Sequence, residues 1–539
     1  MLGQMMDYPL TITSLLKRAH KLFPDREIVT RLPSVAMHRY TYGDCYRRVC
    51  QLANALKRLG MEPGERVGTF AWNNYQHLEL YFAVPCSGAV IHTLNIRLSP
   101  DQLAYVINHA ENKTIFVDYC LLPLLERAVD QIKTVRQYVL IGAPPDVETS
   151  LSPILHYEDL LAGETDDFRW PELDERSAAG LCYTSGTTGN PKGALYSHRS
   201  QFLHSVVAAL GDGIGICNRD SVLAVVPMFH ANAWGLPYTC AMLGTRLVLP
   251  GPHLKPADLA ELIQDEKVTV AAGVPTLWIG LHQHLKAHRY DISSLRVLLI
   301  GGAAAPLGLI QGFEEDFNVP VMHAWGMTEL SPMGTNSGLL NDQPTLTREE
   351  RYQRKLRQGS PVPGVELRIV GEDGKELPWD DKAVGDLQVR GPWVVSSYFR
   401  DPSGDAQFTE DGWFITGDVA RINPQGSMQL TDRSKDLIKS GGEWISSVAL
   451  ENALMSHPKV FEAAVIAIPN EKWTERPLAV VVPQPGQIPT HDELIHHLAD
   501  QFAKFWLPEE IRLVPEIPKT SVGKFDKKVL RQRYADGNL

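Results

Sequence analysis

Short apolar runs alternate with helix-like segments through most of the chain, and this alternation limits the fold more than any other feature. Segments 14–23 and 46–60 carry apolar residues at helical spacing. Runs typical of buried strands are RVGTFAW, TIFVD, SVLAVVP, RLVLP, VTVAAG and RVLLIGG. Strands separated by helices predict parallel sheets with helices on both faces. Because such sheets bind ligands at the carboxyl ends of their strands, the polar and glycine-rich loops there are the first candidates for a site.

The chain of 539 residues is too long for one compact core, and its pattern changes twice. From about Pro361 the runs are short and β-like with frequent glycine and proline, which predicts a small β-subdomain. After Lys435 a compact mixture of helix and strand patterns predicts an independent α+β domain. We therefore expect an α/β protein with a large N-terminal domain over 1–431, a connection at 432–435 and a small C-terminal domain over 436–539.

Charge and cysteine usage narrow the classes of partner. The net charge of −11 disfavours nucleic acid and anionic membrane surfaces as partners. The longest stretch without charged side chains, Ser221–Thr245, is interrupted by prolines, so we interpret it as buried core and loop rather than a membrane span. The seven cysteines have neither disulfide-framework nor zinc-site spacing, and the N-terminus lacks the pattern of a secretory signal. These features predict a cytoplasmic protein.

The segment YTSGTTGNPKG, Tyr183 to Gly193, has the chemistry of a polyphosphate site. Glycines let backbone N–H groups converge on an anion, hydroxyls donate further hydrogen bonds, and Lys192 supplies a positive charge. The GxxxxGK[ST] spacing of a P-loop is absent. The alternative is a flexible linker, but linkers do not usually end in an ordered NPKG turn.

At this segment the chain resembles the acyl-adenylate-forming superfamily of acyl-CoA synthetases, adenylation domains and beetle luciferases. Six further motifs that resemble the family follow in order: PMFHANAWG (227–235), GGAAAP (301–306), AWGMTE (324–329), GWFITGD (412–418), DRSKDLIKSGGEWIS (432–446) and PKTSVGKFDKK (518–528). The resemblance covers the whole chain. It implies an AMP-forming acid–thiol ligase that takes ATP, Mg²⁺, coenzyme A and a small carboxylic acid.

The resemblance also implies a nucleotide site. The residues it assigns there are Thr184, Ser185, Gly186, Thr187, Thr188, Lys192, Gly302, Ala303, Ala304, Ala324, Trp325, Gly326, Asp418 and Arg433. Trp325 offers an aromatic face to adenine where the family more often has Tyr. Asp418 would accept hydrogen bonds from the ribose, although an aspartate after a strand can also simply cap a turn. Thr328 would contact the α-phosphate, and Glu329 would be the Mg²⁺ ligand.

Two further residues are expected to take part in catalysis. A carboxylate must attack the α-phosphate of a highly negative nucleotide, so a cation matched to that charge is needed. We expect Lys524 to be this cation, delivered by closure of the last domain; the alternative is a solvated lysine in a lysine-rich tail. His230 lies in a family motif that borders the acyl pocket, although a lone histidine is more often structural.

For the second half-reaction, family members rotate the small domain about a hinge, and Lys435 occupies the hinge position here. The rotation would bring Lys439, Gly441, Gly442 and Glu443 to the catalytic centre. The two glycines would let the pantetheine arm of coenzyme A pass close to the backbone.

The acyl pocket is expected to include His230, Trp234, Gly301, Gly326 and Pro332. The segment 227–235 contains no acidic residue, so an α-ammonium group would be buried unpaired, and we expect an acid without an α-amine. The bulk of Trp234 and Trp325 favours acids with short or medium acyl chains over acids with long ones. The motifs resemble most those of medium-chain fatty acid–CoA ligases, among them ligases for 3-methylmercaptopropionate, which implies that acid or a similar one as substrate.

Other functions remain open from the sequence. The acyl group could pass to a carrier protein or be oxidised, and release of acyl-CoA with free coenzyme A separates these cases. The chain could also be a nucleotide-binding regulator without catalysis, although the joint presence of Glu329, Asp418, Arg433 and Lys524 argues against that. A homodimer is left open.

Overall fold

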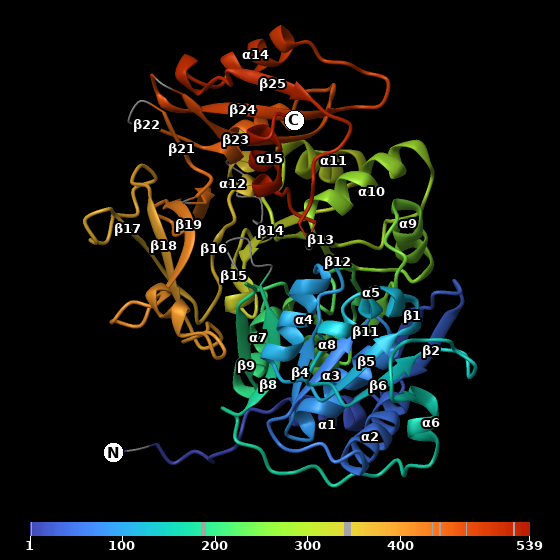
Figure 1. Cartoon of the computed structure of the whole chain (residues 1–539). Helices are drawn as coiled ribbons and strands as arrows, with labels where there is room; N and C mark the ends of the chain where they lie inside the picture. Colours follow the sequence, from blue (N-terminus) through green and yellow to red (C-terminus); the bar gives the residue numbers. More distant parts are fainter. Residues whose placement is uncertain are drawn as a thin grey trace.

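The computed structural model describes residues 1, 3–184, 190–338, 346–433, 435–440, 443–470, 472–520 and 523–539. Within these ranges the strands form four sheets, and helices cover the two largest (Figure 1). The α/β class with parallel sheets, a β-subdomain and a separate C-terminal sheet is confirmed.

The largest described sheet has the strand order β16-β15-β14-β13-β12-β10-β11-β1-β2. Its strands are β1 (Glu27–Arg31), β2 (Met37–Thr41), β10 (Ser221–Ala224), β11 (Arg246–Leu249), β12 (Val270–Gly273), β13 (Val297–Ile300), β14 (Val321–Gly326), β15 (Met333–Asn336) and β16 (Ser360–Pro361). Strands β1, β11, β10, β12, β13 and β14 pair in parallel, and antiparallel pairs close both edges. The parallel strands of this sheet are short and almost completely buried. Their apolar sequences follow from this burial, because strands covered on both faces are apolar throughout.

The second large sheet has the order β7-β6-β5-β3-β4-β8-β9. Its strands are β3 (Arg66–Phe70), β4 (Val90–Thr93), β5 (Thr114–Asp118), β6 (Gln137–Ile141), β7 (Ile154–His156), β8 (Ala178–Tyr183) and β9 (Gly193–Ser197). All neighbours are parallel except the β8–β9 hairpin. Side chains of both large sheets, such as Leu247 and Phe116, belong to one continuous core.

Helices that cover these sheets are α1 (Ile12–Leu22), α2 (Tyr42–Arg58), α3 (Tyr75–Cys86), α4 (Pro100–His109), α5 (Leu122–Glu126), α6 (Tyr157–Ala162), α7 (His198–Ala209), α8 (Leu236–Leu243), α9 (Pro256–Asp265), α10 (Pro275–Ala287), α11 (Leu307–Phe317) and α12 (Arg348–Leu356). The segment 221–245 forms β10, a buried loop and α8, as the sequence indicated. Among the described residues, no helix combines the length and hydropathy needed to cross a membrane.

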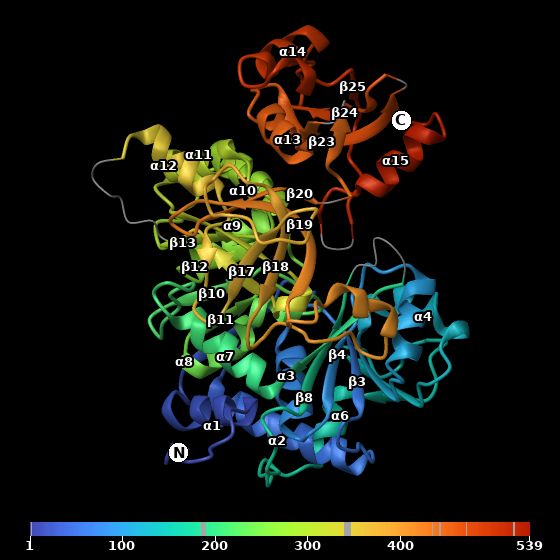
Figure 2. The ribbon, with the colours of Figure 1, turned by 90° about the vertical axis from the view of Figure 1, so that its left-hand side faces the viewer.

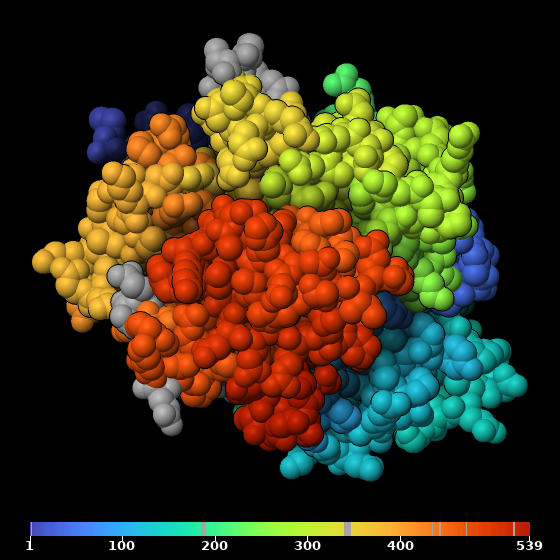
Figure 3. Space-filling view, turned by 90° about the horizontal axis from the view of Figure 1, so that it is seen from above, coloured from blue at the N-terminus to red at the C-terminus, as the bar shows by residue number. Residues whose placement is uncertain are grey.

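The β-subdomain is an antiparallel sheet of β17 (Glu366–Val370), β18 (Gly385–Arg390), β19 (Phe414–Ile422) and β20 (Met428–Arg433). The C-terminal sheet contains β21 (Ile438–Ser440), β22 (Glu443–Ile445), β23 (Val460–Asn470), β24 (Thr474–Pro483) and β25 (Glu510–Leu513), with helices α13 (Ser447–Met455), α14 (His491–Ala499) and α15 (Lys527–Ala535). This part stands apart from the body in Figure 2, and from above it covers the centre of the molecule (Figure 3).

Candidate active site

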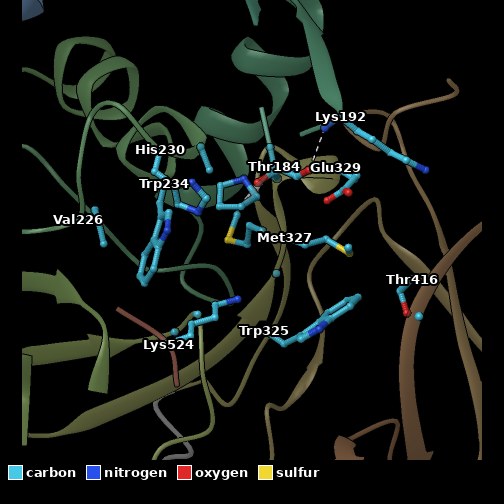
Figure 4. A pocket seen from close by; sticks show the side chains of 18 of the residues that line it. Thr184, Lys192, Val226, His230, Trp234, Trp325, Met327, Glu329, Thr416 and Lys524 are labelled. Atoms are coloured by element: carbon cyan, nitrogen blue, oxygen red, sulfur yellow. Dashed lines mark hydrogen bonds between the residues drawn. The ribbon is translucent and has the colours of Figure 1, made fainter. Parts of the chain in front are cut away.

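The carboxyl ends of the parallel strands open into a cavity of about 760 Å³. Strands β8, β10, β13 and β14 each lead into it, as expected for open α/β sheets. The sequence-predicted residues that line it are Thr184, Lys192, His230, Trp234, Gly301, Gly302, Ala324, Trp325, Gly326, Thr328, Glu329, Pro332, Arg433, Lys435 and Lys524. Figure 4 shows His230, Trp234 and Val226 on one side of the cavity and Lys192, Glu329 and Thr416 on the other.

Other predicted residues lie elsewhere or cannot be placed. Ala303, Ala304 and Asp418 are absent from the described lining, and Lys439 is exposed on β21. The predicted residues Ser185, Gly186, Thr187, Thr188, Gly441 and Gly442 lie outside the described residues, as does the side chain of Glu443. Of the predicted polyphosphate loop, the structure therefore describes only the two ends, Thr184 and the residues from 190 onward. There Thr184 N–H donates to the Lys192 carbonyl at 2.9 Å, and Lys192 N–H donates to Thr184 Oγ1 at 3.1 Å.

A polar cluster surrounds Glu329 at one end of the cavity. The Tyr398 hydroxyl donates to Glu329 Oε1 at 2.7 Å. The Lys192 ammonium lies 4.8 Å from the centre of the Tyr398 ring and donates to Gln407 Oε1 at 2.8 Å. Burial raises the pKa of the Glu329 carboxyl above its usual value, and the Tyr398 hydrogen bond opposes that rise. Tyr398 therefore links a desolvated carboxyl, which its hydroxyl contacts, to a cation that lies over its ring.

Trp325, Asp418 and Arg433 form a second cluster, between β14 and the β-subdomain. Trp325 Nε1–H donates to Asp418 Oδ2 at 2.8 Å, and Arg433 Nε lies 3.1 Å from Asp418 Oδ1. The Asp418 carboxylate is only 4% exposed and raises the pKa of the Arg433 guanidinium. Asp418 thus lies behind the cavity wall and anchors two residues of that wall, Trp325 and Arg433.

Lys524 reaches the cavity from the C-terminal part of the chain. The segment between β25 and α15 descends toward the ends of β13 and β14 (Figure 1). Gly523 has φ +81°, a conformation that residues with a Cβ rarely adopt, and Thr520 N–H donates to the Lys524 carbonyl at 2.7 Å. Lys524 Cε lies 3.9 Å from the position that a Cβ on Gly302 would take. Burial, together with the charge of Arg433, lowers the pKa of Lys524 to about 8.

His230 and Trp234 border the opposite, apolar end. Burial, together with the charges of Lys524 and Arg97, lowers the pKa of His230 to about 3, so this imidazole is neutral at neutral pH. Residues 231–234 all have positive φ, between 43° and 57°, which is costly backbone for residues with a Cβ. This turn directs the indole of Trp234 over Gly301, where an added Cβ would lie 3.0 Å from the ring.

Sequence reasoning missed several residues of the site. Tyr398 and Gln407 belong to none of the recognised motifs, and their contacts with Glu329 and Lys192 join segments far apart in the chain. His204 lines the cavity from the middle of α7, where its spacing is that of an ordinary helix residue. The single sequence signal for Tyr398 is its position in the loop that follows β18, and this is weak.

Comparison with known proteins agrees with the sequence motifs. The chain matches the AMP-binding enzyme family over residues 16–399 and the AMP-binding enzyme C-terminal domain over residues 449–524. It is 47% identical to a long-chain-fatty-acid–CoA ligase of Thermus thermophilus over 98% of this chain and 96% of the relative. It is 46% identical to a 3-methylmercaptopropionyl-CoA ligase of Ruegeria lacuscaerulensis over 99% of both chains.

Solved structures agree with this result. The anthranilate CoA ligase AuaEII in complex with anthranoyl-AMP superposes with a TM-score of 0.86 at 25% identity, over 98% of this chain and 99% of its own. ATP-bound MatB from Rhodopseudomonas palustris superposes with a TM-score of 0.83 at 26% identity, over 98% of this chain and all of its own. The family resemblance inferred from the motifs is thus confirmed, and the chain belongs to the AMP-binding enzyme family.

Proposed function

We propose that this chain is an AMP-forming acyl-CoA synthetase that activates a short- or medium-chain carboxylic acid through an acyl-adenylate. The observation that carries the proposal is the entry of Lys524, from the C-terminal part of the chain, into a cavity whose other described lining residues lie between 105 and 435. There it joins Lys192, Arg400, Arg433 and Lys435, so cationic side chains from distant segments meet in one cavity. CoA ligase relatives of nearly equal length support the same reaction.

In this proposal the nucleotide occupies the polar end of the cavity. Thr184 and Lys192 bind its phosphates, Trp325 and Gly302 flank the adenine, and Arg433, held by Asp418, lies near the ribose. The predicted residues Ser185 to Thr188 would complete the phosphate loop. Thr328, which lines the cavity next to Glu329, would contact the α-phosphate.

The residues at the polar end fit a Mg²⁺ ion. Mg²⁺ is usually bound by one or two carboxylates together with nucleotide phosphates. Glu329 lines the cavity as a desolvated carboxyl whose raised pKa reflects its burial, and a bound cation would favour its charged form. When bound there, the ion would neutralise phosphate charge.

The first step needs cations rather than covalent catalysis. A carboxylate oxygen of the acid forms a bond to the α-phosphorus, the bond between the α-phosphorus and the bridging oxygen breaks, and pyrophosphate leaves. Lys524 in its protonated form would bridge the substrate carboxylate and the α-phosphate as negative charge develops. His230 stays neutral and would border the acid without adding a second positive charge.

In the second step the thiolate of coenzyme A attacks the acyl carbonyl, and AMP leaves with the electron pair of the broken C–O bond. We propose that residues 436–539 rotate as a domain about Lys435 against residues 1–431, withdrawing Lys524. The same rotation would bring Lys439, now exposed on β21, and the segment with Gly441, Gly442 and Glu443 to the cavity. The domain boundaries and the hinge remain predictions.

The acid is proposed to be 3-methylmercaptopropionate or a similar short or medium acid. The apolar end is lined by Ile214, Val226, Leu299, Met333 and Trp234, and no acidic side chain lies among them. The Trp234 indole packs over Gly301, and its bulk there would limit the length of the acyl chain. Two relatives at 45–46% identity are 3-methylmercaptopropionyl-CoA ligases.

A panel of acids of increasing length, with ATP, Mg²⁺ and coenzyme A, tests the proposal. We expect AMP and acyl-CoA to form in equal amounts and turnover to fall for long chains. If AMP formed without acyl-CoA for every acid, the acyl acceptor would be a molecule other than coenzyme A, such as a carrier protein. Binding of ATP without any AMP would indicate the regulator alternative, and a preference for long chains would contradict the proposed acid.

The pH dependence of adenylation should follow Lys524. Because its pKa is lowered to about 8, the protonated fraction of Lys524 falls as pH rises through that value. We therefore expect kcat/KM for adenylation to decline about tenfold for each pH unit well above 8, since kcat/KM reports groups of the free enzyme. Pyrophosphate release measured from pH 6 to about 10 gives the profile. The residual activity of Lys524→Ala should not show this decline at high pH. If the variant showed the same decline, the decline would belong to a group other than Lys524.

A further inference from the structure

Buried polar side chains join the β-subdomain to the C-terminal part of the chain close to Lys435. Asp432, near the end of β20, is only 3% exposed, and Ser447, at the start of α13, is 0% exposed. Strand β20 belongs to the β-subdomain, whereas α13 packs against β23 of the C-terminal sheet (Figure 2). The two residues therefore lie on opposite sides of the proposed pivot.

Hydrogen bonds connect the two sides. Ser447 N–H donates to Asp432 Oδ2 at 2.7 Å, and the Ser447 hydroxyl donates to the same oxygen. The neighbouring Ser446 hydroxyl donates to the Thr431 carbonyl. Because hydrogen bonds to an ionised acceptor are stronger than those between neutral groups, Asp432 fixes the start of α13 to β20.

Lys527 continues this connection toward the loop that carries Lys524. The Lys527 ammonium donates to the Ser447 hydroxyl at 2.6 Å and pairs with Glu451 Oε1 at 2.7 Å. Burial lowers the pKa of Lys527, but the carboxylates around it, that of Glu451 first, outweigh burial and raise the pKa above its usual value. The charged Lys527 begins α15, directly after the segment that contains Lys524. Asp432 is thus connected, through Ser447 and Lys527, to the segment that places Lys524 in the cavity.

The proposed rotation must break this connection. If residues 436–539 rotate about Lys435, Asp432 stays with the body of the molecule while Ser447 and Lys527 move away from it. The bonds between Asp432 and Ser447 therefore favour the orientation in which Lys524 lines the cavity over the rotated orientation.

We infer that Ser447 is a positioning residue for adenylation, because its hydroxyl joins Asp432 to Lys527 and thereby holds Lys524 at the cavity. The inference rests on the proposed function and deepens it, since it names contacts that set the balance between the two orientations. A change that weakens these contacts shifts the population away from the adenylation orientation. It should therefore slow the first half-reaction without slowing the second.

Ser447→Ala tests the inference, because it removes the hydroxyl and keeps the backbone N–H that bonds Asp432. We expect acid-dependent pyrophosphate release to slow about 10-fold, the equivalent of one hydrogen bond to a charged group. Conversion of presynthesised acyl-adenylate and coenzyme A to acyl-CoA should be at least as fast as in the unmodified enzyme.

The matched control is Ser456→Ala, at the other end of α13. The Ser456 hydroxyl contacts the Ala453 carbonyl at 2.7 Å and His497 Nε2 at 2.9 Å, and both partners lie in the C-terminal part. Because these contacts do not cross the pivot, Ser456→Ala should leave the rates of both half-reactions unchanged.

Separate measurement of the two half-reactions distinguishes positioning from a merely structural role. A loss of folded enzyme would slow both steps in proportion, and such a parallel loss in Ser447→Ala would overturn the inference. Adenylation by Ser447→Ala at the unmodified rate would overturn it as well. If no acid at all supported AMP formation by the unmodified enzyme, the proposed function itself would fail.

Discussion

Replacing Lys524 by alanine should lower the rate of acyl-adenylate formation about 100- to 1,000-fold, the usual cost of removing one group that stabilises transition-state charge. Lys524 is held at the cavity by a loop whose conformation depends on Gly523, and it lies beside Gly302. ATP affinity should change little, because the proposed bridge to the α-phosphate matters mainly as the carboxylate attacks. Acid-dependent pyrophosphate release measures the effect, and equilibrium ATP binding measures the affinity.

Two controls make this prediction specific. Lys528 lies in the same lysine-rich segment but is exposed, so Lys528→Ala should behave as the unmodified enzyme. In addition, Lys524→Ala should still convert presynthesised acyl-adenylate and coenzyme A to acyl-CoA, because Lys524 is proposed to leave before that step. Adenylation by Lys524→Ala at the unmodified rate would remove Lys524 from the catalytic residues.

Replacing Asp418 by alanine should raise the KM for ATP about 10- to 100-fold, in line with the loss of charge-assisted hydrogen bonds. Its carboxylate accepts from Trp325 and pairs with Arg433, so both residues lose their anchor at once. The buried indole N–H is then unpaired, and we expect the free energy of unfolding to fall by about 1–3 kcal/mol. Initial-rate kinetics and denaturant unfolding give the two values.

Asp418→Asn separates the two contacts of Asp418. Its amide oxygen can still accept from Trp325 but carries no charge toward Arg433, so stability should largely return while the KM for ATP stays raised. The control Asp411→Ala removes an exposed carboxylate of the same subdomain, which pairs with Arg368, and should leave the KM unchanged. An unaltered KM in Asp418→Ala would show that Asp418 acts outside the nucleotide site.

Much of the fold follows from local pattern. Runs such as TIFVD and RVLLIGG are short, apolar and bounded by polar segments, and they form the buried parallel strands β5 and β13. The short β-like runs after Pro361 form the antiparallel subdomain, because frequent glycine and proline favour tight turns. The division of the parallel strands between two sheets could not be predicted, since pairing between strands far apart in sequence depends on packing of the whole core.

The candidate site was predictable where residues lie in family motifs. Glu329, Arg433 and Lys524 come from three motifs, and the structure brings all three to one cavity. The prediction that Asp418 contacts the ribose stays untested, and the structure adds its hydrogen bond with Trp325 across 93 positions of sequence.

Contacts that depend on tertiary structure alone were not predictable. Tyr398 reaches Glu329, and His204 faces the cavity, without a local pattern that distinguishes either residue from its neighbours. The left-handed turn at residues 231–234 was missed for a related reason. Ala, Asn and Trp do not favour positive φ strongly enough for the sequence to predict such a turn, so the packing of the surrounding core must impose it.

Oxygen-isotope transfer tests the central claim most directly. The proposed mechanism places one carboxylate oxygen between the acyl carbon and the α-phosphorus, and thiolysis then leaves that oxygen on AMP. With an acid labelled in its carboxylate oxygens by oxygen-18, mass spectrometry should find one labelled oxygen in each AMP formed with acyl-CoA. Label in inorganic phosphate or pyrophosphate, with unlabelled AMP, would contradict an acyl-adenylate and the roles assigned to the residues around the α-phosphate.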